Sequence, residues 1–244
     1  MALSGSSNYI IDRDTLATAS LRMLGVVAEG GTATAAQLTT ANQALNLMLK
    51  GLQRDGMHLW MRRSATLSAG NITEGQEVFT ISSSGSDITA DRPLDILEVT
   101  LEDENGNENN LIKISQKEYW ELPDKAIKGV PTQWYYDPQL DEGDLYMWPT
   151  ANTNIETNYA LNILYIKPFD DVDSSTNDFE VPQEWLEVIK YGLAWRLAPE
   201  YGISLNERRM LLQEYTMLKN EALSWDTEHN SIYLRPEWRG GWRK

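Results

Sequence analysis

The sequence has 244 residues, of which 41% are hydrophobic, so it predicts a folded protein with one large domain or two small ones. It has no cysteine, which excludes disulfides, thiolate metal sites and a cysteine nucleophile. The formal net charge of −15 argues against tight, sequence-independent binding of nucleic acid, because such binding needs a surplus of Lys and Arg.

The first residues, 1–8, have neither the basic start nor the apolar stretch of a signal peptide. No apolar run approaches the roughly 20 residues that a membrane-spanning helix needs. We therefore expect a short N-terminal arm and no membrane segment.

Two helices are predicted near the N-terminus. The first covers residues 12–25 and can be capped by Asp12 or Asp14. The second runs from Thr34, a good capping residue, to Asp55. The apolar residues of the second helix recur in steps of three and four, which is typical of one helical face: Leu38, Ala41, Leu45, Met48 and Leu52. This stripe is interpreted as facing the subunit's own core, and a neighbouring subunit is the alternative.

From about residue 63 the pattern changes to short alternating runs separated by Gly, Asn and Asp, which predicts a small antiparallel β-sandwich or barrel. Asn105-Gly106 predicts a hairpin turn. Leu97, Val99 and Leu101 alternate with polar residues, so we expect them to share one buried face of a strand. The predicted strands are 77–81, 97–101, 110–114, 132–136, 145–148 and 159–166, with one short helix over 115–122 capped by Ser115.

The helix that begins near Pro182 has the clearest boundaries in the chain. Pro182 can occupy the first helical position, where no N–H is needed, and Pro199 and Gly202 mark the end. Gly192 is expected to allow another helix to approach closely. The apolar residues at helical spacing are Trp185, Val188, Ile189, Leu193 and Leu197, and those of a last helix over 204–225 are Leu211, Tyr215, Leu218, Ala222 and Trp225.

These elements predict an α+β fold, in which N- and C-terminal helix pairs form one helical bundle around an inserted antiparallel β domain. The expected divisions are 1–62 for the first helices, 63–177 for the β domain, 178–228 for the second helices and 229–244 for an extended tail. The residues expected in the helical core or at a subunit interface are Leu38, Leu45, Leu52, Trp185, Ile189, Gly192, Leu193, Leu211, Tyr215 and Leu218.

The tail differs in charge from the rest of the chain. Residues 229–244 hold four basic side chains and one acidic, a net charge of +3, whereas the other 228 residues hold 17 basic and 35 acidic, a net charge of −18. Aromatic residues alternate with basic ones in a segment that cannot form its own core, so we expect it to dock on a partner. The residues expected to dock are Tyr233, Arg235, Trp238, Arg239, Trp242, Arg243 and Lys244.

Reactive groups are scarce. The two histidines, His58 and His229, have no motif around them, which argues against a metal site or a histidine-based triad. The acidic run 170–180 does not fit an EF-hand, because Thr176 stands where that loop needs glycine; weak cation binding is the alternative to a solvated linker. No motif nominates a glycosidase-type carboxylate pair. We therefore expect no catalytic residue, metal or cofactor.

Several segments, taken in order, resemble the head-to-tail adaptor proteins of short-tailed phages. That group includes packaged-DNA-stabilisation factors, tail accessory factors and tail tubular A proteins. The order and spacing of the segments carry the resemblance, which covers most of residues 12–226, and the shorter members lack much of the β insertion. The matching segments are 19–25, 36–49, 55–60, 128–137, 145–149 and 182–202.

The resemblance implies a non-enzymatic structural protein of the virion neck or tail, made in the host cytoplasm. It implies a dodecameric ring under the portal that lengthens the DNA channel, with DNA passing through without sequence-specific binding. The implied partners are the portal protein, nozzle or other tail proteins, tail fibres and further copies of the chain.

Two rival functions remain open from the sequence. One is a virion-associated cell-wall hydrolase. The other is a β domain that binds a ligand or glycan through exposed aromatic residues, although packing on a small sheet is the simpler interpretation of those residues: Trp134, Tyr135, Tyr136, Tyr146 and Trp148.

Overall fold

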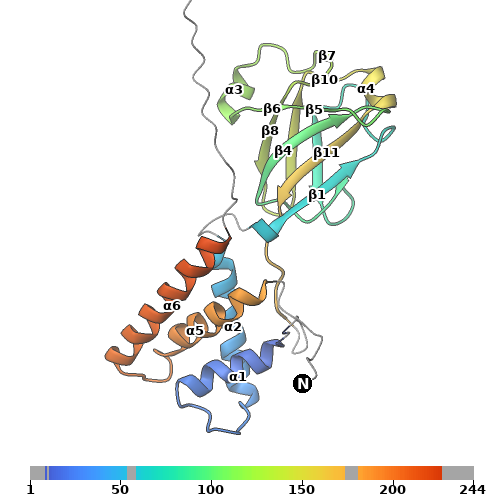
Figure 1. Ribbon diagram of the computed structural model, residues 1–244. Helices are drawn as coiled ribbons and strands as arrows, with labels where there is room; N and C mark the ends of the chain where they lie inside the picture. Colours follow the sequence, from blue (N-terminus) through green and yellow to red (C-terminus); the bar gives the residue numbers. More distant parts are fainter. Residues whose placement is uncertain (1–8, 10, 54–58, 174–180, 227–244) are drawn as a thin grey trace, which may run out of the picture.

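The computed structural model describes residues 9, 11–53, 59–173 and 181–226. Within them the protein is a mixed α and β structure with six α-helices and two main sheets. Figure 1 shows four long helices at one end and the strands at the other. We call helices α1, α2, α5 and α6 the helical region, and the strands with the short helices α3 and α4 the β region.

The helical region consists of α1 (Arg13–Met23), α2 (Ala35–Leu52), α5 (Gln183–Leu197) and α6 (Leu205–Trp225). Asp12 caps α1 by accepting from the Thr15 N–H, and Thr34 forms a capping box with Gln37 at the start of α2. Pro182 was expected inside the first turn of α5. It instead flanks the helix, because its ψ of 151° lies outside the helical range.

Helix α5 lies at the centre of the helical region, since α1, α2 and α6 all pack against it. Helix α6 lies at the edge, with α5 as its main neighbour, and of its residues only Ala222 is buried. The fully buried centre of this core is formed by Leu16, Leu21, Leu45, Met48, Ile189, Leu193 and Leu197.

The β region contains two sheets. The first is antiparallel, in the order β1 (Arg62–Leu67), β11 (Ala160–Ile166), β4 (Asp95–Glu102) and β5 (Glu108–Asn110). The second has the order β3 (Ile88–Thr89), β2 (Val78–Ser82), β9 (Gly143–Trp148), β8 (Gln133–Pro138) and β6 (Ile112–Lys113). Side chains from both sheets form one core, which includes Phe79, Val99, Trp134, Leu145 and Ile163.

Short elements complete the β region: η1 (Leu59–Met61), α3 (Gln116–Glu121), α4 (Thr153–Asn158), β7 (Lys128–Gly129) and β10 (Thr150–Ala151). The predicted helix with Ser115 as its cap is confirmed as α3. The predicted antiparallel pairing is confirmed for the longer strands, whereas β3, β6 and β7 each pair in parallel with a neighbour. These parallel strands have two residues each, too few for an alternating pattern to show in the sequence.

The predicted strand 110–114 is split between the two sheets. The Leu111 N–H donates to the Val99 carbonyl in the first sheet, and the next N–H, that of Ile112, donates to Thr132 beside the second. Leu111 itself is buried between them. The chain therefore crosses from one sheet to the other at a single residue.

Strand β4 departs from the expected alternation at Leu97. Its pairing with β11 shifts by one residue, so that Glu98 faces Leu164 while Ile96 faces Tyr165, and Leu97 has no direct partner. This bulge directs Ile96 into the β core, whereas Leu97 packs against the core of the helical region. The prediction that Leu97 shares a face with Val99 is therefore wrong.

Candidate interaction surfaces

The closest helix contact in the helical region is at Gly192. A Cβ at this position would lie 2.7 Å from Met48 Sδ on α2 and 2.8 Å from Tyr215 Cε2 on α6. Beside it, the rings of Trp195 and Tyr215 stack with centroids 6.0 Å apart. Only glycine fits here without a shift of its neighbours, so Gly192 fixes how closely α2, α5 and α6 approach.

The ten residues expected in the helical core or at a subunit interface all lie in or against this one core. Leu45, Leu52, Trp185, Ile189, Gly192 and Leu193 are buried, and Leu38, Leu211, Tyr215 and Leu218 are half-buried. Contacts within one subunit already account for the six buried residues. A subunit interface therefore has to use other side chains.

Trp225, the last residue of the stripe predicted on α6, is not in the core. It is 81% exposed and lines a pocket of about 180 Å³ with Trp60, Pro182 and Trp185. The last turn of α6 extends past the buried Ala222, and the Trp225 side chain lines a hollow beside the first turn of α5.

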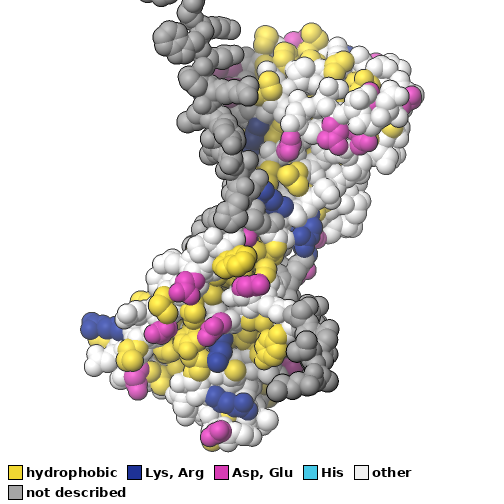
Figure 2. Space-filling view, viewed as in Figure 1, with side chains coloured by type: hydrophobic (Ala, Val, Ile, Leu, Met, Phe, Trp, Pro, Cys, Tyr) yellow, Lys and Arg dark blue, Asp and Glu magenta, His cyan; other side chains and the backbone are white. Residues whose placement is uncertain are grey.

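Helix α6 exposes large apolar side chains on the surface that α5 does not cover. Met210 is 67% exposed and Met217 is 50% exposed, and these two residues are two turns apart on one side of the helix. Figure 2 shows hydrophobic side chains gathered over the helical region, interspersed with charged ones. We call Met210 and Met217 the α6 patch. Exposed apolar groups gathered in one place mark interaction sites.

A second apolar surface lies between α1 and α5. It is a groove of about 350 Å³, and its apolar lining includes Ile11, Leu16, Ala19 and Leu186. Helix α5 presents Leu186 to this groove and Gly192 to α6. Leu186 and Gly192 are six residues apart. Since each residue turns an α-helix by 100°, these two positions lie on different sides of α5.

Aromatic rings cover part of the five-stranded sheet. Tyr119 of α3 lies against Tyr135 and Tyr146, with centroids 5.9 and 5.1 Å away. Burial, with smaller effects from Glu77 and Tyr146, raises the pKa of the Tyr119 hydroxyl to about 12. The neighbouring Trp120 is 65% exposed, with Lys125 Nζ 5.2 Å from its ring centroid.

The aromatic residues considered for ligand binding are mostly occupied by packing. Trp134 and Tyr136 are buried, and each donates to a backbone carbonyl, that of Leu111 at 3.1 Å and that of Pro93 at 2.6 Å. Trp148 is half-buried and donates to the Asp124 carbonyl at 2.8 Å.

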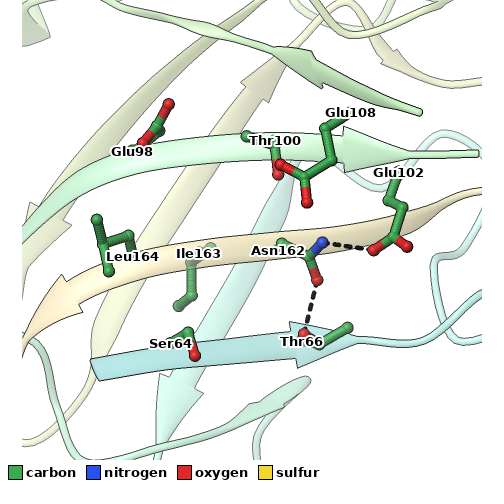
Figure 3. Close-up of a pocket in the computed structure, with 9 residues that line it drawn as sticks. All are labelled: Ser64, Thr66, Glu98, Thr100, Glu102, Glu108, Asn162, Ile163 and Leu164. Carbon is green, nitrogen blue, oxygen red and sulfur yellow. Dashed lines mark hydrogen bonds between the residues drawn. The ribbon is translucent and has the colours of Figure 1, made fainter. Parts of the chain in front are cut away.

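The outer face of the four-stranded sheet carries a polar groove of about 350 Å³ (Figure 3). Three carboxylates line it, those of Glu98 and Glu102 on β4 and of Glu108 on β5. Sequence reasoning missed this groove, because its residues come from strands far apart in the chain. In the sequence, the three glutamates share only one feature, which is that each occupies an outward-facing position of its strand.

The remaining predicted groups give no chemical site among the described residues. Asp170 and Asp171 of the acidic run form ion pairs with Lys167 at 2.9 Å and Lys50 at 2.8 Å. No cluster of three or more His, Asp or Glu side chains in the described part of the chain could hold a metal ion. Its helices lack the length and apolar character needed to span a membrane. Both histidines lie outside the described residues, as do the seven predicted docking residues of 229–244.

Comparison with known proteins shows the family to which the chain belongs. The sequence pattern of the SU10 adaptor protein family matches residues 13–233, which is most of the chain. The chain belongs to the SU10 adaptor protein family. It is therefore a phage adaptor protein, as the resemblance predicted, and this structural family favours a non-enzymatic role. A search of curated proteins gave no match.

Proposed function

We propose that this SU10 adaptor family member is one subunit of a dodecameric ring beneath the portal of a short-tailed phage. The ring extends the DNA channel and supports attachment of tail proteins. In this proposal the four long helices are one folding unit that forms the wall of the ring, and residues 63–177 are a β domain inserted into it. The family membership supports the adaptor role, and the two apolar surfaces of the helical region support the ring.

The observation that carries the ring is the position of these surfaces. A closed ring needs a head-to-tail interface, in which two different patches of one subunit meet their counterparts on the neighbours. The α6 patch and the α1–α5 groove are such a pair, since α5 separates them within the subunit. The α6 patch of one subunit enters the α1–α5 groove of the next.

The charge of the chain fits a channel that DNA can pass through. Outside residues 229–244 the net charge is −18, from 17 basic and 35 acidic side chains. An acidic wall makes few contacts with phosphates, so DNA can slide along it. The basic, aromatic residues 229–244 dock on the portal.

The ring interface is tested by replacing Met210 and Met217 together with Glu. Burying two carboxylates in an apolar contact is costly, so the variant should no longer assemble on purified portal while its thermal unfolding stays close to wild type. Leu140→Glu is the control for adding a carboxylate at an exposed apolar position, because Leu140 is 88% exposed in the β region. Assembly of the Met210→Glu/Met217→Glu variant at wild-type level would refute this interface.

Portal docking is tested by deleting residues 229–244. The two hydrophobic cores of the described chain are formed by residues 11–223, and we expect the fold to survive the deletion. We expect binding to the portal to be lost. Unchanged binding of the shortened chain would refute the docking role.

A further inference from the structure

The groove on the outer face of the four-stranded sheet has an excess of hydrogen-bond acceptors. The Thr66 hydroxyl donates to Asn162 Oδ1 at 2.6 Å, and Asn162 Nδ2 donates to Glu102 Oε2 at 2.8 Å (Figure 3). The amide of Asn110 donates to Glu98. The side-chain amides of Asn162 and Asn110 are thus used within this face, while Glu108 makes no hydrogen bond or ion pair with any described residue.

The carboxylates are placed where they repel each other. Glu102 and Glu108 are direct partners in the β4–β5 register, and like charges in that position destabilise a sheet. None of the residues that line the groove is Lys, Arg or His. The described chain therefore leaves this repulsion without a neutralising cation inside the groove.

A second observation, independent of the carboxylates, is a further hydrogen-bonding group in the groove, the hydroxyl of Thr100. Thr100 lies between Glu98 and Glu102 on β4. The residue is only 9% exposed, and its hydroxyl makes no hydrogen bond with any described residue. Figure 3 shows its side chain in the groove beside Glu108. The hydroxyl oxygen of Thr100 is not among the buried atoms of the described chain that lack a partner, so it is open to the groove and can accept a hydrogen bond from a group bound there.

The chemistry of the groove selects a cationic hydrogen-bond donor. A guanidinium group carries five N–H donors and forms short, charge-assisted bonds to carboxylates, and a threonine hydroxyl can accept a further one. A metal ion is a poorer fit, because the described residues provide no cluster of ligands for one.

The chain itself has one strongly basic segment, residues 229–244, with Arg235, Arg239, Arg243 and Lys244. The described chain ends at Asp226, which lines a pocket with Trp60, just before β1. From Trp60 to Ser64, the first groove residue on β1, is four residues, or roughly 13 Å of extended chain. The 18 residues after Asp226 can span up to roughly 60 Å, so they can reach the groove.

We propose that the acidic groove formed by β1, β11, β4 and β5 binds residues 229–244 of this chain through their arginine and lysine side chains. The groove holds the segment before assembly and releases it to the portal. The release rests on the portal docking proposed above, whereas the binding in the groove does not.

The test measures how fast trypsin cuts the full-length protein after Arg239 at low salt. Mass spectrometry follows the cleavage. Glu102→Gln/Glu108→Gln should speed this cleavage roughly fivefold, as expected for the loss of two surface ion pairs. The control Glu104→Gln/Glu156→Gln removes the same charge outside the groove and should leave the rate unchanged. In 1 M NaCl, where charges are screened within about 3 Å, the wild-type rate should rise to that of the groove variant.

Thermal unfolding verifies that the groove variant folds, and its midpoint should equal or exceed that of the wild type, because the repulsion between Glu102 and Glu108 is gone. Equal cleavage rates in wild type and the groove variant at low salt would overturn the proposal. So would an equal acceleration in the control variant.

Portal binding separates this proposal from the docking role. The groove variant should bind the portal as well as the wild type or better, whereas deletion of 229–244 should abolish binding. If the deleted chain still binds the portal, the docking role fails while the cleavage result still decides whether the groove binds the segment.

Discussion

The helical region and the β region differ in the surfaces they expose. Helix α6 presents Met210 and Met217 to solvent, whereas the outer face of the four-stranded sheet presents Glu98, Glu102 and Glu108. An apolar surface suits a contact that stays closed once formed, because removing apolar side chains from water stabilises the contact. A surface of carboxylates suits a contact that can be released, because ionic attraction at a surface is weak and screened by salt. The two regions thus suit different steps of assembly.

The two substitutions with the largest expected effect on stability test whether each region has its own core. Leu45→Ala empties a fully buried site in the helical core, and Leu145→Ala does so in the β core. Each should lower the free energy of unfolding by about 2–5 kcal/mol. Hydrogen exchange should show faster opening mainly in the region that carries the substitution. If either substitution speeds exchange equally in both regions, the two cores are not separate units.

A smaller effect is expected at the helix crossing. Gly192→Ala places a methyl group against Met48 and Tyr215, and such overpacking costs about 1–3 kcal/mol. Gly51→Ala on α2 is the control, because its nearest new contact is the flexible Arg196 Nη2 at 3.2 Å. Alanine is the better helix former, so this control should be neutral or stabilising by up to about 1 kcal/mol. Thermal unfolding compares them, and equal midpoints would contradict the close packing at Gly192.

The smallest effect concerns alkaline pH and belongs to the β region. The pKa of Tyr119 is raised to about 12, from a usual value near 10, mainly by burial of its hydroxyl. A raised pKa contributes stability that is fully present below pH 10 and is lost as the pH rises toward 12. The unfolding free energy should therefore fall by roughly 1–2 kcal/mol over that range. Tyr119→Phe should reduce this fall, and an identical pH profile for the variant would show that Tyr119 is not its cause.

The parts of the fold that depend on neighbouring residues in sequence could be predicted. Thr34 and Ser115 were identified as helix caps because a capping bond joins residues three apart. The stripe on α2 was interpreted as core-facing because its spacing matches one helical face, and Ala41, Leu45, Met48 and Leu52 are buried.

Features that depend on a distant partner could not be predicted. The bulge at Leu97 arises from the register with β11, which lies more than sixty residues later in the chain. The exposure of Trp225 depends on where α5 begins beside the end of α6. The acidic groove combines residues from four strands that pair only in the folded sheet. A single sequence gives no signal for any of these long-range pairings.

The mass of the protein alone and in the presence of purified portal tests the adaptor role most directly. Native mass spectrometry should show single chains in the absence of portal, and a complex with a fixed number of copies on each portal after mixing. The Met210→Glu/Met217→Glu variant should stay unassembled in the same experiment. A portal whose mass is unchanged after mixing with the wild-type chain would contradict the proposed assembly.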